Sequence, residues 1–167
     1  MEVDSVKSVS LKLDLDDQQR KKFDPERTFF LLSKYSVRNA FIPPTALKML
    51  RNVRDAKTRY DLKMRSVHSG GEALAAEILA WGTEVFGSLA EMYGMTEIGF
   101  VVGNCPSILK VKPGSLGKPY PGHPVEIVDT EGKLVAPGVL GEIVIHKSCL
   151  LYTSDAADEL DGVDLGG

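Results

Sequence analysis

The sequence predicts an α/β fold in which a parallel sheet with flanking helices runs into a small antiparallel β subdomain. Between residues 24 and 95, short apolar runs alternate with longer segments whose apolar residues recur at helical spacing. This alternation is typical of a parallel sheet covered by helices. From residue 100 onward, glycines and prolines become frequent, and two apolar runs flank a turn. Such a pattern favours antiparallel pairing.

The first helix is predicted to begin at Asp24, because an aspartate can cap the free amides of a helix and Pro25 suits its first turn. Apolar residues follow at helical spacing, namely Phe29, Leu31, Leu32 and Tyr35. A short buried strand is expected over residues 39–42, where Pro43-Pro44 ends it. A second helix is expected over residues 45–53.

The next strand is expected over residues 64–68, and Ser69-Gly70-Gly71 breaks it. A helix over residues 72–86 follows and ends at Gly87. Its core positions are Leu74, Ile78, Leu79, Trp81 and Val85. A third strand is expected over residues 88–92, with its end at Gly94.

Residues 100–120 are predicted to be mostly loop, because glycine and proline recur there. Beyond them, residues 125–128 and 141–146 are expected to be antiparallel strands, with a turn at residues 129–132. These two strands are the predicted small β subdomain.

Composition excludes several classes of protein. The 167 residues are enough for one domain, and 43% of them are hydrophobic. The formal net charge is −3, but both ends are acidic, so the middle is net positive and suits an anionic small ligand such as a nucleotide. Its basic residues are not clustered among aromatic ones, so no nucleic-acid partner is expected.

The two cysteines and three histidines suggest neither a disulfide framework nor a zinc site. No apolar run has the length of a membrane span, and the N-terminal residues lack the pattern of a signal peptide. We therefore expect a cytoplasmic protein without a transmembrane segment.

The two ends differ from the middle. Residues 8–15 alternate between polar and apolar side chains, which alone is consistent with an edge strand. Residues 149–159 read Cys-Leu-Leu-Tyr-Thr-Ser-Asp-Ala-Ala-Asp-Glu and resemble the translated read-through of a transposase sequencing adapter. We expect residues 1–19 to be extraneous or poorly ordered, residues 20–148 to fold, and residues 149–167 to be an adapter-derived tail. A natural acidic tail is the alternative.

Two loops that follow predicted strands have the composition of ligand-binding turns, and ligands of open α/β sheets bind beyond the carboxyl ends of the strands. The first loop is Ser69-Gly70-Gly71-Glu72-Ala73. Its glycines allow close approach to a flat ligand, and the amides at the start of the next helix can face an anion or a base edge. An ordinary strand-to-helix turn, with Glu72 near the helix N-terminus, explains the same residues.

The second loop is Glu91-Met92-Tyr93-Gly94-Met95-Thr96-Glu97. Tyr93 offers an aromatic face, and Gly94 leaves space beside it. Thr96 offers a hydroxyl group, and Glu97 offers a hard carboxylate oxygen of the kind that Mg²⁺ prefers. Together they form a candidate nucleotide site, and the alternative is a polar turn after a buried strand.

These residues resemble the signatures of adenylate-forming enzymes. Tyr-Gly-x-Thr-Glu stands at residues 93–97, and Gly71-Glu72 precedes it at the usual distance. The segments at residues 113–119 and 138–143 match further family motifs in the same order, and the region from Asp24 to Thr45 matches ahead of them. Residues 103–105 and 118–122 are most similar to AMP-forming acyl-CoA synthetases of the short- to medium-chain group.

The resemblance implies that residues 20–148 are part of the N-terminal, AMP-binding domain of such an enzyme. It assigns nucleotide binding to Gly71, Glu72, Ala73, Glu91, Met92, Tyr93, Gly94, Met95 and Thr96. Tyr93 would stack on the adenine and Thr96 would contact the α-phosphate, while Glu97 would bind Mg²⁺, so Thr96 and Glu97 are the candidate catalytic residues. Gly94 would also line the substrate pocket. Acetate-selective relatives carry a tryptophan there, so acyl groups longer than acetyl are expected.

The implied reaction activates a carboxylic acid with ATP and Mg²⁺ to an acyl-adenylate, and CoA, the co-substrate, then takes the acyl group. The phosphate loop, the ribose-binding aspartate and the catalytic lysine of the family have no counterpart in the sequence, so the chain is expected to be inactive alone. The alternatives are another adenylate-forming enzyme, such as a peptide-synthetase adenylation domain or an aryl-CoA ligase, and a non-catalytic nucleotide-binding module.

Overall fold

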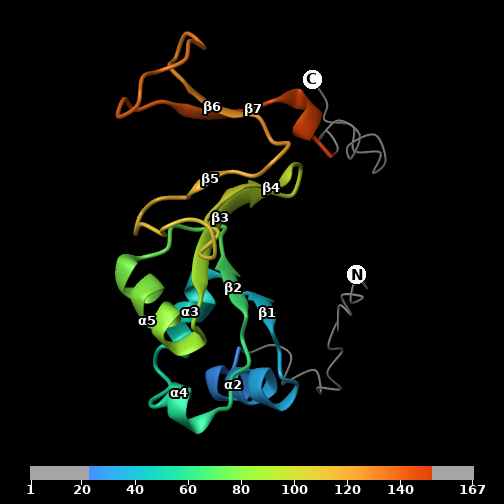
Figure 1. The fold of residues 1–167 in the computed structure, drawn as a ribbon, viewed down its shortest axis with the longest axis vertical. Coiled ribbons are helices and arrows are strands. Elements are labelled where there is room, and N and C mark those ends of the chain that lie inside the picture. Colours follow the sequence, from blue (N-terminus) through green and yellow to red (C-terminus); the bar gives the residue numbers. More distant parts are fainter. Residues whose placement is uncertain (1–22, 152–167) are drawn as a thin grey trace, which may run out of the picture.

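The computed structural model describes residues 23–151, whose arrangement is shown in Figure 1. Helices and parallel strands form an α/β layer at one end, and a two-stranded ribbon lies at the other. Five strands form one mixed sheet, in which neighbouring strands follow one another in chain order, while the last two strands form a second sheet. No helix of the described residues has the length and hydropathy to cross a bilayer. The possible edge strand at residues 8–15 lies outside the described residues.

Helix α2 (Pro25–Lys34) begins where the sequence predicts it. The Asp24 side chain accepts a hydrogen bond from the backbone amide of Arg27 at 3.1 Å, which satisfies a free amide of the first turn. Pro25 stands at the first helical position, where its missing N–H removes no intrahelical bond. The helix buries Phe29 and Leu32 in the core of the layer.

Three strands run parallel, as predicted: β1 (Asn39–Phe41), β2 (Ser66–Ser69) and β3 (Leu89–Met95). Ala40 lies in register with Val67, and Val67 with Leu89, so these side chains share the face that packs against the helices. Strand β1 is at the sheet edge, and Phe41 is 48% exposed. The prediction of a buried strand at residues 39–42 is therefore wrong about burial, since only Ile42 among these residues is buried.

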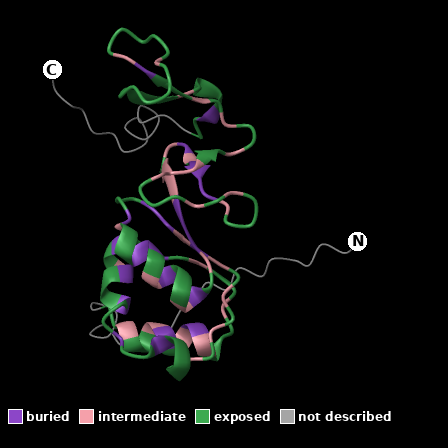
Figure 2. Cartoon of the chain, turned by 60° about the vertical axis from the view of Figure 1, so that its left-hand side comes forward, coloured by how far each residue is buried: buried purple, intermediate pink, exposed green. Residues whose placement is uncertain are grey.

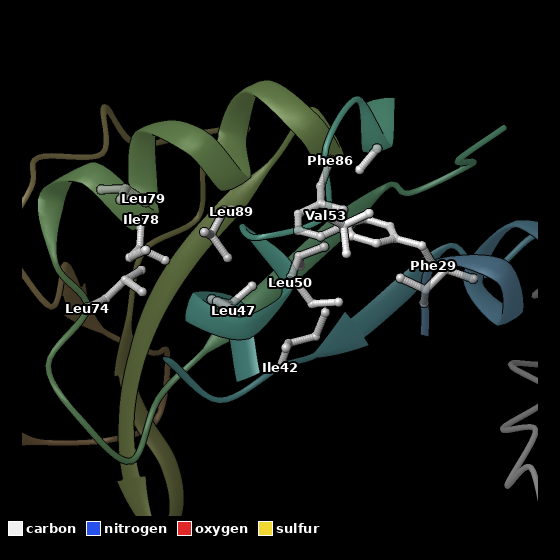
Figure 3. Packing of buried hydrophobic residues seen from close by; sticks show 13 residues of the cluster. Phe29, Ile42, Leu47, Leu50, Val53, Leu74, Ile78, Leu79, Phe86 and Leu89 are labelled. Carbon is white, nitrogen blue, oxygen red and sulfur yellow. The ribbon is translucent and has the colours of Figure 1, made fainter. Parts of the chain in front are cut away.

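Three further helices complete the layer: α3 (Pro44–Leu50), α4 (Ala56–Arg59) and α5 (Ala76–Phe86). With α2 and the parallel strands they enclose one hydrophobic core (Figure 3). Its buried side chains are Phe29, Leu32, Ile42, Leu47, Leu50, Val53, Ala56, Val67, Leu74, Ile78, Leu79, Phe86 and Leu89. The Phe29 ring stacks against the rings of Tyr60 and Phe86 at centroid distances of 5.4 and 5.9 Å. This core fixes β2 and β3, from which the site loops leave.

Helix α5 begins at Ala76, later than the predicted start at residue 72. Gly71 has a φ of +89°, a left-handed conformation that does not start a helix. The amide of Leu74 donates to the carboxylate of Glu91 at 3.0 Å instead of entering a helical turn. Residues 70–75 are therefore a loop, and the alternative that placed Glu72 near a helix N-terminus is wrong. The helix ends at Gly87, as predicted.

Strand β3 continues past Gly94, its predicted end, and pairs with the antiparallel strand β4 (Gly99–Gly103) in a region predicted to be loop. The cause is a close approach of the two backbones. A Cβ atom at Gly94 would collide with the carbonyl oxygen of Gly99 and would lie 2.7 Å from the Cα of Phe100. Glycine at this position therefore permits pairing rather than ending the strand. The register shifts between Tyr93 and Gly94, within the predicted nucleotide loop.

The second half of the chain holds a smaller core. The buried residues of this core are Ile98, Val101 and Val102, and the residues packed against them are Tyr93, Leu116, Val125 and Ile145. The remaining strands are β5 (Lys118–Pro119), β6 (Val125–Val128) and β7 (Glu142–Ile145), and the last two pair antiparallel, as predicted. Figure 2 shows that buried residues concentrate in the α/β layer, whereas the ribbon is mostly exposed.

The first three residues of the tail predicted at residues 149–167 fall within the described part of the chain. Cys149 is buried at the end of the short helix η1 (Lys147–Cys149). The amide of Leu151 donates to the carbonyl oxygen of Glu97 at 2.8 Å, although its side chain is 68% exposed. Residues 152–167 lie outside the described residues, and the adapter origin of the tail stays a prediction.

Candidate functional site

A cavity of about 410 Å³ opens where the parallel half of the large sheet meets the antiparallel half. Three segments line it: the loop after β2, strand β3 and the loop between β4 and β5. The lining residues are Gly71, Glu72, Ala73, Leu74, Glu91, Met92, Tyr93, Gly94, Gly114 and Leu116. The first predicted ligand-binding loop and residues 91–94 of the second therefore meet in one cavity beyond the carboxyl end of β2. The prediction of a loop at residues 91–95 is wrong, since these residues belong to strand β3.

The buried carboxylate of Glu91 holds the first of these loops. Glu91 is 6% exposed, and its Oε1 atom accepts the hydrogen bond from the Leu74 amide at 3.0 Å. A buried charged group needs such partners, because water no longer solvates it. The sequence resemblance assigned Glu91 to the nucleotide. The structure adds that Glu91 anchors the loop that carries Gly71, Glu72 and Ala73.

Glu72 is held by Thr45, which lies in the first turn of α3. The Thr45 hydroxyl donates to the Glu72 carboxylate, with Oγ1–Oε distances of 2.9 and 3.1 Å. Sequence reasoning missed the role of Thr45. The signal for it was the Pro43-Pro44-Thr45 segment, which resembles the family but carries no catalytic group of its own.

Tyr93 is shared between the cavity and the small core. Its side chain packs against the buried cluster of Ile98, Val101 and Val102, and it also lines the cavity. This packing holds an aromatic ring at the cavity wall before any ligand arrives. Met92 and Gly94 complete the same wall on either side of Tyr93.

Three predicted residues lie outside the cavity lining. Met95 ends β3 and is 49% exposed, while Thr96 and Glu97 occupy the turn that leads into β4. Thr96 is exposed and Glu97 is half-buried. The structure therefore brings the predicted adenine-binding residues together and places the predicted phosphate and metal residues directly beyond them along the chain.

Glu97 is the single residue for which metal binding was predicted. Among residues 23–151, no three histidine, cysteine, aspartate or glutamate side chains lie close enough together to hold a metal ion. Mg²⁺ usually keeps several waters and takes one or two protein carboxylates together with substrate phosphates. A single half-buried carboxylate on a turn fits that arrangement rather than an all-protein cage.

Gly114 and Leu116 are cavity residues to which sequence reasoning gave no role. They lie in the segment at residues 113–119, which resembles a family motif but has no side chain with obvious chemistry. The loop that carries them is held by Asn104, which is 2% exposed and donates to the carbonyl oxygen of Ser115 at 2.7 Å. A fixed loop thus forms the third wall.

His68 on β2 lies beside the site but does not add charge to it. Burial lowers the pKa of His68 below its ordinary value, so the ring is neutral at pH 7. In register, His68 lies between Phe41 and Ala90, on the sheet face opposite the helices.

Comparison with known sequences places these features in a family. The sequence profile of the family described as AMP-binding enzyme matches residues 16–152. An uncharacterised acyl-CoA ligase of Bacillus subtilis is 36% identical over 76% of the chain, and an acetyl-coenzyme A synthetase of the same organism is 36% identical over 75%. The chain spans only 24% and 23% of the lengths of these two relatives.

Solved structures show the same fold. A luciferase-like enzyme of the mealworm Zophobas morio matches 78% of the chain and 33% of its own, with a TM-score of 0.71 and 27% identity. An acyl-CoA synthetase of Brucella canis matches 74% of the chain and 23% of its own, with a TM-score of 0.68 and 31% identity. These similarities confirm the predicted α/β fold with its small antiparallel sheet.

Proposed function

We propose that this chain, which belongs to the AMP-binding enzyme family, supplies the nucleotide-binding residues of an AMP-forming acyl-CoA synthetase. The predicted resemblance to acyl-CoA synthetases is confirmed by the relatives and by the fold. Because the chain spans 20–24% of the length of the first curated relatives, the activity of the complete enzyme belongs to the proposal.

One observation carries the proposal: the loop after β2 and strand β3, which both contain residues of the family signatures, line one cavity. The adenine is proposed to lie between the Gly71-Glu72-Ala73 backbone and the Tyr93 ring. Packing already holds that ring in place, so little ordering is needed when the base stacks on it. Met92 and Glu91 extend the wall on the same strand.

In the proposed reaction, a carboxylate oxygen of the acid attacks the α-phosphorus of ATP. The bond to the β-phosphate oxygen breaks, and pyrophosphate leaves with its electron pair. The thiolate of CoA then attacks the acyl carbon, and AMP leaves. The residues of this chain contribute mainly by positioning, with the Thr96 hydroxyl donating to an α-phosphate oxygen and Met95 flanking the nucleotide.

Glu97 is proposed to hold Mg²⁺ together with the nucleotide phosphates. When bound, the metal neutralises phosphate charge that develops during the displacement. The position of Glu97 on the turn directly after Thr96 places the carboxylate beside the proposed α-phosphate contact. Neither residue is needed to build the cavity, because both lie outside its lining.

The proposed acid is longer than acetate, because the resemblance places Gly94 where acetate-selective relatives carry a tryptophan. The glycine itself does not widen the cavity, since a side chain at residue 94 would point toward the backbone of β4. Burial of each additional CH₂ group is worth about 0.8 kcal/mol in an apolar pocket. A tryptophan at residue 94 is not a clean probe of this idea. A Cβ atom there would meet the backbone of β4 rather than open space.

A chimeric enzyme tests the proposal. Residues 20–148 would replace the matching segment of the Bacillus subtilis acetyl-coenzyme A synthetase, and acid-dependent ATP–pyrophosphate exchange would be measured with acetate, butyrate and hexanoate. We expect exchange, with kcat/KM shifted toward the longer acids relative to the parent enzyme. Each methylene should contribute roughly 1–3 kcal/mol of discrimination.

A chimera that melts like the parent but lacks exchange with every acid would overturn the proposal. Exchange with an unchanged preference for acetate would overturn the substrate assignment alone. Binding of AMP to the 167-residue chain itself provides an independent check on the cavity.

A further inference from the structure

We infer that Thr45 is a positioning residue, which holds the loop at residues 70–75 in its nucleotide-binding conformation through the carboxylate of Glu72. The inference rests on the proposed function, because the position of this loop affects chemistry only if the cavity takes a nucleotide.

The loop has no regular structure and depends on ties from neighbouring elements. Within residues 23–151, side chains outside the loop form hydrogen bonds with it at two places. Glu91 on β3 holds the buried end through the Leu74 amide, and Thr45 on α3 holds the exposed end through Glu72. Of the loop residues that line the cavity, Glu72, Ala73 and Leu74 lie at or between these hydrogen bonds, and Gly71 directly precedes them.

Thr45 is well placed to act as a fixed point. Helix α3 is anchored by Leu47 and Leu50, both fully buried in the core, and Pro44 fixes the backbone of its first turn. A branched side chain such as threonine has few accessible rotamers, so its hydroxyl is held in direction. The accepting carboxylate is charged, which strengthens the hydrogen bond. The core of the α/β layer is thereby coupled to the loop.

Loss of the Thr45 hydrogen bond should lower nucleotide affinity rather than slow the chemical step. Glu72 and its neighbours are exposed, so without Thr45 the loop must be ordered when the ligand binds. That ordering costs free energy and weakens binding. Loss of one hydrogen bond of this kind corresponds to about a two- to tenfold loss of affinity.

The test uses the 167-residue chain and three variants. Thr45→Val removes the hydroxyl but keeps the branched shape, and Thr45→Ser restores the hydroxyl. Thr58→Val is the matched control, because Thr58 is also exposed in the first turn of a helix but donates to the Asp55 carbonyl oxygen, away from the cavity. Heteronuclear amide relaxation reports the order of residues 70–75, and AMP titration of the amide spectrum reports affinity.

We expect Thr45→Val to increase the motion of the Gly71 and Glu72 amides and to weaken AMP binding by about two- to tenfold, with both effects reversed in Thr45→Ser. The Thr58→Val control should match wild type in both measurements. Unchanged loop motion in Thr45→Val overturns the inference. A wild-type chain that does not bind AMP counts against the proposed nucleotide cavity, and the relaxation data still decide whether Thr45 orders the loop.

Discussion

Two carboxylates near the cavity differ in their surroundings, and this difference separates their proposed roles. Glu91 is 6% exposed and accepts a hydrogen bond from the Leu74 amide. Glu97 is half-buried on the turn between β3 and β4. A buried carboxylate with a backbone partner stabilises the loop to which it is bonded, whereas one on an open turn remains accessible to a cation.

Glu97→Gln in the chimeric enzyme is predicted to reduce ATP–pyrophosphate exchange by roughly a hundredfold, because it removes the charge proposed to hold Mg²⁺ where phosphate charge develops. Stability should change by less than about 0.5 kcal/mol, since the side chain is not in a core. Exchange kinetics and urea unfolding measure the two quantities. Glu126→Gln, an exposed change on β6, is the matched control. Equal exchange in both variants would exclude the metal role.

His68 gives the fold a pH dependence whose sign follows from its burial. Burial lowers the pKa of His68 in the folded chain, whereas an unfolded histidine titrates near about 6.5. Below that pH the unfolded chain binds a proton more readily than the folded chain, so the free energy of unfolding falls as the pH decreases toward the folded pKa. Above about pH 6.5 the contribution is complete.

Urea unfolding of wild type and His68→Asn at pH 7.5, 6.0 and 5.0, chosen to span the ordinary histidine pKa of about 6.5, measures this dependence. We expect wild type to lose more stability than the variant between the first and last pH. Parallel losses in the two proteins would show that other groups cause the acid sensitivity.

Much of the candidate site could be predicted at the level of residues, because the family signatures carry Gly71, Glu72, Ala73 and the residues of β3 that line the cavity. The residues that the sequence did not predict were missed for one physical reason. Thr45 acts through a hydrogen bond to a segment distant in sequence, and Gly114 belongs to a loop that the fold brings to the cavity. Neither residue carries a catalytic group. Local pattern does not report such contacts.

At the scale of elements, boundaries were predicted well where a local signal decides them. Asp24 caps α2 and Gly87 ends α5, as the sequence indicated. Boundaries were wrong where a tertiary contact decides them. The Leu74 amide donates a hydrogen bond to Glu91 instead of joining the predicted helix. The close approach of β4 to Gly94 extends β3 beyond its predicted end.

Gly94→Ala is predicted to destabilise the pairing of β3 with β4. A methyl group there would meet the backbone of Gly99 and Phe100, which cannot move aside like a side-chain tip. We expect a loss of about 1–3 kcal/mol in urea unfolding. Thr130→Ala, an exposed change in the turn after β6, is the control, because surface substitutions of this kind usually change stability by less than about 0.5 kcal/mol. A Gly94→Ala protein as stable as the control would contradict the close approach.

At the scale of the whole molecule, the site lies between two cores of unequal size. Thirteen buried residues form the core of the α/β layer, whereas Ile98, Val101 and Val102 are the buried residues of the small core. The loop with Glu72 is tied to the first core, and Tyr93 packs against the second. A complete cavity therefore requires both cores, which strand β3 connects through its pairing with β2 and β4.

Because the two cores are distinct, shortening one buried side chain in each core is predicted to give different patterns of stability loss and hydrogen exchange. Phe29→Ala should cost about 3–5 kcal/mol and should expose amides of β2 and β3 to hydrogen exchange, because a fully buried aromatic ring is lost. Val101→Ala should cost about 1.5 kcal/mol and should raise exchange in β4 and around Tyr93, while β2 stays protected. Native-state exchange, resolved by residue in the 167-residue chain, measures both patterns. AMP affinity should fall in the Val101→Ala protein even though β2 remains folded, since the aromatic wall loosens. Uniform exchange in both variants would show that the chain unfolds as one unit and that the cavity does not depend on a separable second core.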